Sequence, residues 1–332
     1  MSTPVLLKIR DLHVCFDGAH GEVRAVRGIS YDIHEREVVG IVGESGSGKS
    51  ASAYAVMGLL RGTGRVTGGT VEFRGENVLD YKRESWDALR GKHIGMIFQN
   101  PMECLDPMIS VGSQMREAAM SHSAMSRKTA DERSKELLLR VGIGEPERVM
   151  RQYASALSGG MCQRIMIAMA LIQEPELLIA DEPTTSLDVT VQAQIMDLLE
   201  DIRKERNMAI LFITHDMGLV AQICNTVCVM YAGKIVEKGT VFEIFGDPVH
   251  PYTSGLMKAI PNIEMDRKGK MMSIEGVPAN VTGLPGGCAF HPRCAFCTDD
   301  CRRREPGPVS FGEGRYAACY LAEKEAKTGG AK

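Results

Sequence analysis

The eight-residue segment GESGSGKS, which begins at position 43, has the residue types and spacing of a phosphate-binding loop. Its glycines allow consecutive backbone N–H groups to converge on phosphate oxygens, and a following helix adds its positive N-terminal end. Lys49 would neutralise the charge of the β- and γ-phosphates, and the Ser50 hydroxyl would ligate Mg²⁺. The residues expected to surround the phosphates are Gly43, Ser45, Gly46, Gly48, Lys49 and Ser50. The segment predicts a nucleotide site that uses Mg²⁺.

Two adjacent carboxylates, Asp181 and Glu182, directly follow the apolar run Leu177–Ala180. At the end of a strand, the first carboxylate can hold Mg²⁺ directly or through water, and the second can orient or deprotonate an attacking water. In isolation the pair would fit a solvated acidic turn equally well. Together with a phosphate-binding loop it favours hydrolysis of the nucleotide.

A second anion-binding feature precedes these carboxylates. The sequence LSGGM starts at Leu157, and its Gly-Gly turn opens a helix-forming segment, MCQRIMIAMALI. Such a turn exposes backbone N–H groups at a helix start. The segment Leu157–Asp188 therefore combines an anion-binding turn with a carboxylate pair that can bind a metal ion and a water molecule.

The elements that must position these residues follow from hydrophobic periodicity. Between positions 101 and 156 the pattern changes to amphipathic helices, with Asp131 as a plausible cap, which indicates a helical insertion in an α/β core. Pro and Gly rise and periodicity fades from about Pro248, where we place a domain boundary, and the tail 321–332 is expected to be disordered. The strands expected are Val5–Phe16, Arg24–Ile33, Glu37–Val42, Ile94–Phe98, Leu177–Ala180, Ala209–Thr214 and Thr226–Tyr231, with a hairpin through IVEKG.

The composition excludes several function classes. Among 332 residues the net charge is −3 and aromatic residues make up 5%, which argues against a nucleic-acid binder. The N-terminus lacks the pattern of a signal peptide, and no window reaches the roughly 18 apolar residues of a spanning helix. We expect a cytosolic chain that reaches a membrane only through partners.

The ten cysteines fall into two groups. Five are scattered among apolar neighbours and are expected to be buried and inert: Cys15, Cys104, Cys162, Cys224 and Cys228. The other five, at positions 288, 294, 297, 301 and 319, crowd the C-terminal region, which in a cytosolic protein favours metal or cluster ligation over disulfides. No pair of separated CxxC knuckles is present, so a zinc ribbon fits poorly, whereas a [4Fe–4S] cluster tolerates varied spacing. Zinc and reduced structural thiols remain alternatives; Cys297 is a candidate ligand because CxxCxxxC is compact, and His291 is a weaker one.

Taken together, these motifs resemble an ATP-binding-cassette (ABC) ATPase over about Leu6 to Asp247. The resemblance implies a P-loop NTPase fold with a RecA-like parallel-sheet core, an N-terminal antiparallel β subdomain and a helical subdomain, followed by a small Cys-rich C-terminal extension. LSGGM is similar to the family signature LSGGQ, which implies that Ser158 and Gly160 bind the γ-phosphate held by an opposite subunit. Met161 stands where Gln is usual, so a side-chain contact at that position is not carried over.

The same resemblance implies further roles for single residues. Gln99 fits the Q-loop residue that senses Mg²⁺ or water, and His215 fits the switch histidine that contacts the γ-phosphate. Ser186-Leu187-Asp188 is similar to the D-loop at the dimer interface, although alone it would be a helix-capping turn. Phe16 occupies the place of the aromatic that stacks on adenine, with a core-facing strand residue as the alternative.

The region after the cassette is similar to one branch of this family. His250-Pro251-Tyr252 by itself predicts only a loop and a helix start, but with the Cys-rich tail it resembles the extension of dipeptide, oligopeptide and some nickel importer ATPases, the dipeptide type above all. The resemblance implies a [4Fe–4S] cluster held by four cysteines, with Cys297 as the alternative ligand and Zn²⁺ as the alternative metal. The implied ligands are Cys288, Cys294, Cys301 and Cys319.

The implied role is ATP hydrolysis that energises peptide uptake from the cytoplasmic face of the inner membrane. Its partners would be a second, different ABC ATPase, two membrane permeases and an extracytoplasmic solute-binding protein, with no nucleic acid. A nickel or other small-solute importer is the alternative. A soluble ABC ATPase of DNA repair or translation would predict two fused cassettes or basic extensions, and a switch without turnover would not need Glu182 and His215.

Overall fold

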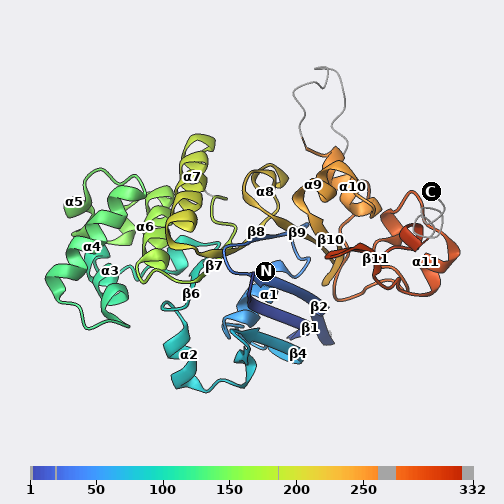
Figure 1. The fold of residues 1–332 in the computed structure, drawn as a ribbon, viewed down its shortest axis with the longest axis horizontal. Helices are drawn as coiled ribbons and strands as arrows, with labels where there is room; N and C mark the ends of the chain where they lie inside the picture. Colours follow the sequence, from blue (N-terminus) through green and yellow to red (C-terminus); the bar gives the residue numbers. More distant parts are fainter. Residues whose placement is uncertain (1–2, 19–20, 186, 261–273, 324–332) are drawn as a thin grey trace. The chain divides into compact units, whose positions relative to one another are not determined.

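The computed structural model describes residues 3–18, 21–185, 187–260 and 274–323. The chain divides into two compact units (Figure 1). The first unit consists of Met1–Leu6, Ile33–Glu37 and Asp80–Phe212. The second consists of Leu7–Asp32, Val38–Leu79 and Ile213–Lys332. The phosphate-binding loop belongs to the second unit, and both the Asp181-Glu182 pair and the signature belong to the first.

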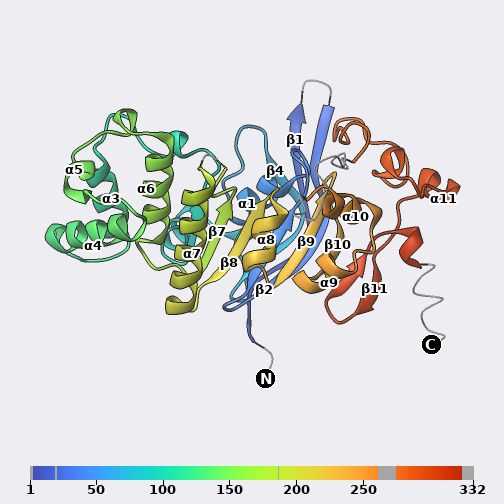
Figure 2. The same ribbon diagram turned by 90° about the horizontal axis from the view of Figure 1, so that it is seen from above.

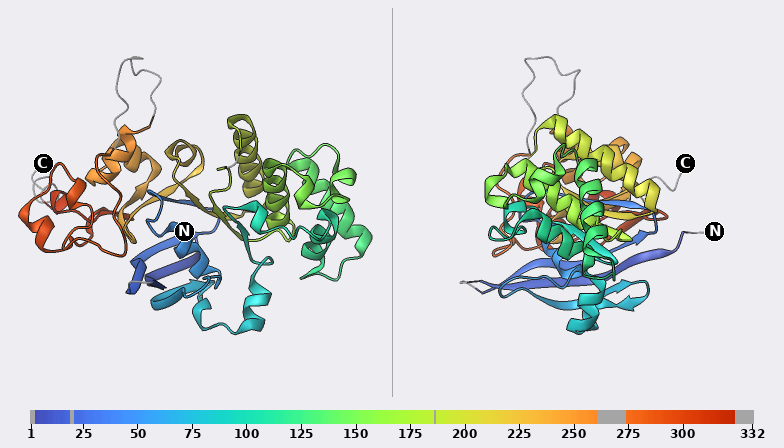
Figure 3. Two further views of the ribbon diagram at one scale, coloured as in Figure 1. Left: turned by 180° about the vertical axis from the view of Figure 1, so that it is seen from behind. Right: turned by 90° about the vertical axis from the view of Figure 1, so that its left-hand side faces the viewer.

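An antiparallel sheet of order β2-β1-β4-β5 forms one part of the second unit (the blue and cyan strands of Figure 3). Its β1 and β2 confirm the two N-terminal strands predicted from alternation, whereas β4 was not predicted because its adjacent glycines, Gly68 and Gly69, interrupt the apolar pattern. Gly69 has φ +89°, and a Cβ there would lie 2.3 Å from the carbonyl oxygen of Asp11, so only glycine fits. The strands are β1 (Val5–Gly18), β2 (Gly21–His34), β4 (Arg65–Phe73) and β5 (Glu76–Asn77).

The strand that leads into the phosphate-binding loop, β3, pairs with β9 in parallel, and β9 pairs with β10 in antiparallel fashion. All five residues of β3 are buried, as its continuously apolar sequence predicts. The elements of this part are β3 (Val38–Val42), α1 (Lys49–Val56), the short 3-10 helix η1 (Val78–Asp80), α8 (Met217–Ile223), β9 (Thr226–Tyr231), β10 (Lys234–Thr240) and α9 (Val241–Gly246).

The first unit contains strands in the order β8-β7-β6 and a group of helices in which α3 and α4 contact each other and α6 (green in Figure 1). Pairing of β6 with β7 is parallel, as expected for an α/β core. The strands are β6 (Ile94–Ile97), β7 (Leu177–Asp181) and β8 (Ala209–Thr214). The helices are α2 (Arg83–Leu89), η2 (Pro101–Glu103), α3 (Val111–Met120), α4 (Arg127–Arg140), α5 (Pro146–Met150), η3 (Ala154–Ala156), α6 (Gly159–Leu171) and α7 (Val189–Arg206).

The helical insertion predicted between positions 101 and 156 is present, but its predicted cap is wrong. Helix α4 starts earlier, at Arg127, because the Ser126 side chain accepts a hydrogen bond from the N–H of Thr129. Asp131 lies inside this helix and instead pairs with Arg116, at 2.8 Å.

The predicted C-terminal extension, residues 248–320, contributes two strands to the sheet of β10. Its β12 pairs with β10, and β11 pairs with β12, all antiparallel. The strands β10 and β11 are labelled in Figure 2. The strands β11 and β12 are too short and too polar to be read from periodicity. Its elements are α10 (Pro251–Lys258), η4 (His291–Arg293), α11 (Asp299–Arg303), β11 (Val309–Gly312) and β12 (Arg315–Ala317).

Some sequence predictions concern the chain ends and the scattered thiols. Of the tail 321–332, expected to be disordered, positions 324–332 lie outside the described residues, whereas Ala322 is buried. Four of the five scattered cysteines are buried as predicted, but Cys104 is only partly so and its thiol donates to the carbonyl oxygen of Asn100 at 3.3 Å. Among the described residues, no helix combines the length and the apolar character needed to cross a membrane.

Candidate functional site

The phosphate-binding loop of the second unit has a backbone that only glycine can form at two positions. Gly43 has φ +152°, and a Cβ there would lie 2.1 Å from the carbonyl oxygen of Met230. Gly48 has φ +101°, and its Cβ would lie 2.2 Å from the carbonyl oxygen of Ala25. Gly46 also has positive φ, +78°, but faces open space. The loop is therefore held tightly against neighbouring backbone while Ser45 and Gly46 stay exposed at its tip.

Lys49, the first residue of α1, is directed back over this loop. Its Nζ donates to the carbonyl oxygen of Gly43 at 2.7 Å and to that of Glu44 at 3.1 Å, although the residue is only 5% exposed. Ser50 follows in the first turn of α1, so its hydroxyl and the N-terminal N–H groups of this helix lie at the same end. An ammonium group and helix N–H groups at one loop form a site for a polyanion.

In the first unit, the carboxylates predicted to act on water are both buried. Asp181 ends β7 and is fully buried; Glu182 follows it with φ +49°, a left-handed conformation that is costly for a residue with a side chain. Gln99 Nε2 donates to Glu182 Oε2 at 3.0 Å, so the structure brings together these two predicted residues. Strained backbone is often found at functional sites, so the left-handed conformation of Glu182 supports a functional role for this side chain.

One residue of this corner was not predicted. The Thr185 hydroxyl donates to the same Glu182 oxygen, Oε2, at 3.0 Å. With two donors on one oxygen, the carboxylate is held in a fixed orientation. Thr185 lies only three residues beyond Glu182 in the turn that follows β7. A hydroxyl residue this close to the predicted base could have been identified as its hydrogen-bond partner.

The signature predicted to bind a γ-phosphate forms the start of α6. Ser158 is the N-cap and its hydroxyl oxygen accepts from the N–H of Met161 at 3.3 Å. A Cβ on Gly159 would meet nothing within 4 Å, whereas one on Gly160 would lie 3.4 Å from Leu187. The turn is therefore open on its Gly159 side, and the first N–H groups of α6 lie where an anion would be bound.

The remaining predicted ATP-site residues lie near the ends of strands and helices. Asp188 is the N-cap of α7, and its side chain accepts a hydrogen bond from the N–H of Val191 at 3.0 Å. This is the helix-capping role that the sequence offered as the alternative to a D-loop. Ser186, named with it, lies outside the described residues. His215 directly follows β8 and is exposed, and Phe16 is partly exposed. A Cβ on Gly64 would lie 2.6 Å from the Phe16 ring, so this ring needs glycine beneath it.

Four of the five C-terminal cysteines line one cavity of about 90 Å³. They are Cys288, Cys294, Cys301 and Cys319, the set that the family resemblance implied. Cys297 does not line this cavity, and its thiol donates to the carbonyl oxygen of Thr298 at 3.5 Å. No group of three or more metal-binding side chains is close enough to hold a single metal ion in the part of the chain that the structure describes. We call the space around these four cysteines the cysteine pocket.

Burial disfavours ionisation of two thiols in this pocket, Cys288 and Cys294. It raises the pKa of Cys288 to about 11 and raises that of Cys294 above its ordinary value. Burial therefore favours the neutral thiol at both positions. Only a positively charged group in the pocket would make their thiolates favourable.

Two contacts with the phosphate-binding loop were not predicted from the sequence. The hydroxyl oxygen of Tyr252 and the guanidinium of Arg293, both from the C-terminal extension, contact Glu44. They lie more than 200 positions along the chain from Glu44, and nothing in the local sequence indicates these contacts.

The chain is similar to known transport proteins over almost its whole length. Residues 26–185 match the family model described as "ABC transporter", and residues 236–301 match "Oligopeptide/dipeptide transporter, C-terminal region". The oligopeptide transport ATP-binding protein OppD of Salmonella typhimurium is 46% identical, with 97% of this chain and 95% of the relative covered. The dipeptide transport ATP-binding protein DppD of Escherichia coli is 44% identical, with 95% of this chain and 96% of the relative covered.

Solved structures agree with the cassette fold. A dimeric post-hydrolysis structure of the ATP-binding cassette MJ0796, bound to ADP and Pi, is similar with a TM-score of 0.65 at 25% identity and covers 71% of this chain and 98% of that one. CbiO1 from Clostridium perfringens, part of the ABC transporter complex cbiONQ, gives a TM-score of 0.61 at 31% identity, with 73% of this chain and 91% of that one covered. Both likenesses support the fold class predicted from the motifs.

Proposed function

The chain belongs to the ABC transporter family, and on this basis we propose that it is the ATP-hydrolysing subunit that energises import of oligopeptides or dipeptides. The observation that carries the substrate class is the near full-length identity to peptide-transport relatives, which includes the extension after the cassette. This favours the peptide importer over the nickel alternative. The protein is an ATPase, and ATP with Mg²⁺ is its substrate and metal.

We assign the chemistry of the first unit to the corner around Glu182. A water oxygen attacks the γ-phosphorus while the bond to the β,γ-bridging oxygen breaks, and ADP departs with that oxygen. Glu182 takes the proton that the water loses, and Gln99 and Thr185 hold its carboxylate in position. Asp181, at the end of β7, is the proposed Mg²⁺ ligand, since Mg²⁺ prefers carboxylate oxygens. Gln99 would sense Mg²⁺ or the water; His215, which belongs to the second unit, would contact the γ-phosphate.

The second unit supplies the phosphate-binding loop. Lys49 already lies over the loop's carbonyl oxygens, so the incoming β- and γ-phosphates would compete with these carbonyls for its ammonium group. Ser50 is the proposed second protein ligand of Mg²⁺, and Phe16 the proposed surface for adenine. The other proposed contacts to phosphate are Gly43, Ser45, Gly46 and Gly48.

A second cassette completes the site in this proposal. Ser158 and Gly160 would contact the γ-phosphate bound to the partner, and Asp188 would lie at the interface. The open approach to Gly159 supports this, because an anion can reach the start of α6 there. The partners proposed are a second ABC ATPase, forming a heterodimer, two permeases and a solute-binding protein, with this chain at the cytoplasmic face of the membrane. The cassette is assigned to residues 5–247 and the extension to 248–320.

For the cysteine pocket we propose a [4Fe–4S] cluster held by the four lining thiols. The cavity of about 90 Å³ is several times the roughly 15 Å³ that one water requires, so it has room for a larger group. Four thiols that share a cavity without crowding around one point fit a cluster, which takes one thiolate per iron, better than a single Zn²⁺ with sulfurs about 2.3 Å away. A cluster would supply positive charge that offsets the burial of Cys288 and Cys294.

The direct test of the hydrolytic role is Glu182→Gln in the assembled transporter. Removing the base should lower the ATP hydrolysis rate by about 10²- to 10⁴-fold while ATP binding is retained, because Gln keeps the shape of the side chain. Glu205→Gln, at an exposed glutamate of the same unit, is the matched control and should hydrolyse ATP at the wild-type rate. Normal turnover in Glu182→Gln would contradict the assignment.

A further inference from the structure

The C-terminal extension contacts the phosphate-binding loop through a bidentate ion pair. Arg293 Nη1 and Nη2 donate to the two carboxylate oxygens of Glu44 at 2.7 and 3.0 Å. The Arg293 side chain is 5% exposed and that of Glu44 is 24% exposed, so solvent screens this pair weakly. Arg293 Nε donates to the carbonyl oxygen of Glu275 at 3.0 Å, and Nη2 also donates to that of Ile274 at 3.3 Å. The arginine is thus fixed on both sides.

A second contact reaches the backbone of the same loop residue. The N–H of Glu44 donates to the hydroxyl oxygen of Tyr252 at 2.9 Å, and Tyr252 is fully buried. Its position follows from the His-Pro-Tyr run, because His250 caps α10 by accepting from the N–H of Tyr252 at 3.0 Å and Pro251 occupies the first helical turn. The buried carboxylate of Glu237, on β10, accepts from the N–H of His250 at 2.9 Å. A motif that predicts only a helix start therefore directs a hydroxyl at the phosphate-binding loop.

Residues next to Tyr252 and Arg293 line the cysteine pocket. Phe290 and His250 line it, and the Phe290 ring centroid lies 5.4 Å from that of Tyr252. Arg293 precedes Cys294, one of the four lining thiols, directly in sequence. A change in the pocket can therefore reach Glu44 by two short paths, one through the Phe290 and Tyr252 rings and one through the Arg293 backbone.

The charge of Glu44 gives these contacts their consequence. A carboxylate in a loop that binds a triphosphate repels its ligand unless a cation neutralises it. Arg293 is that cation, and Tyr252 holds the backbone of the same residue.

We propose that Arg293 and Tyr252 are positioning residues for ATP, and that through them the C-terminal extension, including the content of its cysteine pocket, sets the affinity of the phosphate-binding loop. The proposal rests on the assignment of this loop to ATP. It gives the extension a role in the ATPase cycle that its own sequence does not indicate.

The first test is a double-mutant cycle in the assembled transporter, read as the KM for ATP and kcat separately. Arg293→Gln should raise the KM for ATP about tenfold with kcat changed less than about twofold, because an unneutralised carboxylate weakens binding but leaves Glu182 in place. Glu44→Gln removes the carboxylate that repels ATP, so it should not raise the KM for ATP. Adding Arg293→Gln to it should raise the KM far less than tenfold, because no carboxylate is left to neutralise. Tyr252→Phe, which removes only the hydroxyl, should raise the KM for ATP about threefold.

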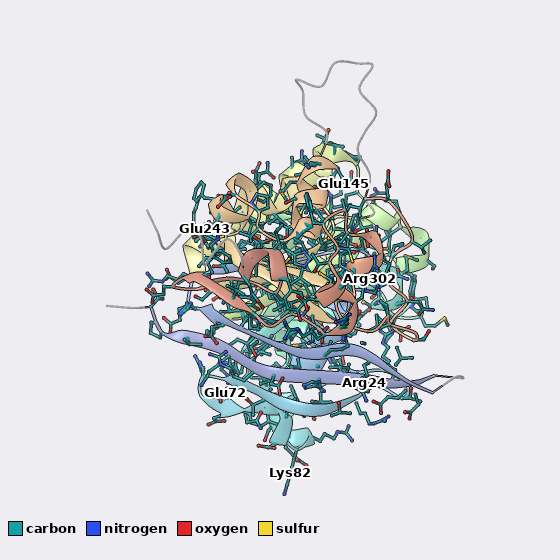
Figure 4. All side chains as sticks on the ribbon, turned by 90° about the vertical axis from the view of Figure 1, so that its right-hand side faces the viewer. Arg24, Glu72, Lys82, Glu145, Glu243 and Arg302 are labelled. Carbon is teal, nitrogen blue, oxygen red and sulfur yellow. The ribbon has the colours of Figure 1, made fainter. Side chains whose placement is uncertain are left out.

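The matched control is Arg302→Gln, at an exposed arginine of α11 in the same extension (Figure 4). It should leave both constants unchanged. If Arg293→Gln leaves the KM for ATP unchanged, or if the double variant is as weak as the sum of the two single effects, the positioning role is overturned. Tyr252→Phe keeps the volume of the ring, so it remains informative if Arg293→Gln fails to fold.

The second test concerns the pocket and is read by equilibrium binding of a fluorescent ATP analogue rather than by turnover. Iron and sulfide are measured on anaerobically purified wild type and on Cys301→Ser. If wild type carries iron and Cys301→Ser loses it, the variant should bind the analogue several-fold more weakly, and adding Arg293→Gln should weaken binding no further. Iron loss with unchanged binding would overturn the link to the pocket. Iron-free wild type would instead overturn the cluster, and the double-mutant cycle would still decide the positioning role.

Discussion

The ATP motifs and the C-terminal extension are built in different ways. Lys49 contacts carbonyl oxygens five and six positions away, and Thr185 contacts Glu182 three positions away. The extension reaches Glu44 with Tyr252 and Arg293, which are 208 and 249 positions distant. Chemistry encoded by neighbouring residues can be recognised from spacing, whereas chemistry assembled by long-range packing cannot.

The two regions also meet their structural demands by different means. The ATP motifs depend on unusual backbone: positive φ at Gly43, Gly48 and Glu182. The extension depends on buried polar side chains, such as those of His250 and Arg293, whose partners are backbone groups and the carboxylate of Glu44. Substitutions should therefore damage the ATP motifs through conformation and the extension through lost partners.

The largest effect is expected at Gly43. Gly43→Ala places a Cβ 2.1 Å from the carbonyl oxygen of Met230, and backbone cannot move aside cheaply, so the loss of stability should exceed about 4 kcal/mol. Gly46→Ala is the matched control: its φ is +78° but nothing lies within 4 Å of its Cβ, so about 1–2 kcal/mol is expected. Thermal or urea unfolding checks both. Equal losses would show that close packing does not distinguish the two glycines.

The second largest effect is expected for the pH dependence of stability that His250 causes. Burial lowers the pKa of His250 to about 4 from 6.5, so the unfolded chain binds a proton at a pH where the folded protein does not. The contribution of this histidine to stability is complete above pH 6.5 and is lost as the pH falls toward about 4, a change of roughly 3 kcal/mol. His250→Asn retains a side chain that can cap α10, so urea unfolding of this variant should show a flatter acid dependence over that range.

Glu237 acts in the opposite direction on this pH dependence. Burial raises the pKa of its carboxyl, so the folded protein accepts this proton more readily than the unfolded chain and acid favours folding through it. The difference in slope between wild type and His250→Asn isolates the histidine. An unchanged slope would mean that His250 is protonated in the folded protein.

The smallest effect is expected at Cys297. Cys297→Ser should retain the iron and sulfide content of wild type, because this thiol does not line the cysteine pocket. Cys294→Ser, three positions earlier, should lose most of both. Elemental analysis and visible absorbance of anaerobically purified protein give the comparison. If Cys297→Ser lost its iron and Cys294→Ser retained it, Cys297 would be the cluster ligand in place of Cys294.

Much of the fold was predictable from the sequence because its core strands are continuously apolar or strictly alternating. The strands β3, β6, β7, β8 and β9 were predicted within one residue at each end. The strand β4 was missed because of its glycines, and β11 and β12 because they obtain partners only from β10 and from each other. The cap of α4 was wrong because Asp131 was preferred to Ser126, which hydrogen-bonds the first turn.

The candidate site divides in the same way. Its phosphate-binding loop and the buried carboxylates were predictable because each motif places its residues on one strand–loop–helix unit. Spacing alone left Cys297 as an open alternative, and only the cavity separates it from the four lining thiols. Neither Arg293 nor Tyr252 gave a signal, since their role depends on Glu44 being brought beside them by folding.

The most direct test of the central claim is peptide uptake by proteoliposomes that contain this chain with its partner cassette and permeases. With a peptide-loaded binding protein outside and ATP inside, a labelled oligopeptide or dipeptide should accumulate in proportion to the ATP hydrolysed, and Glu182→Gln should abolish both. ATP hydrolysis that proceeds without peptide accumulation, or uptake that persists in Glu182→Gln, would contradict the account.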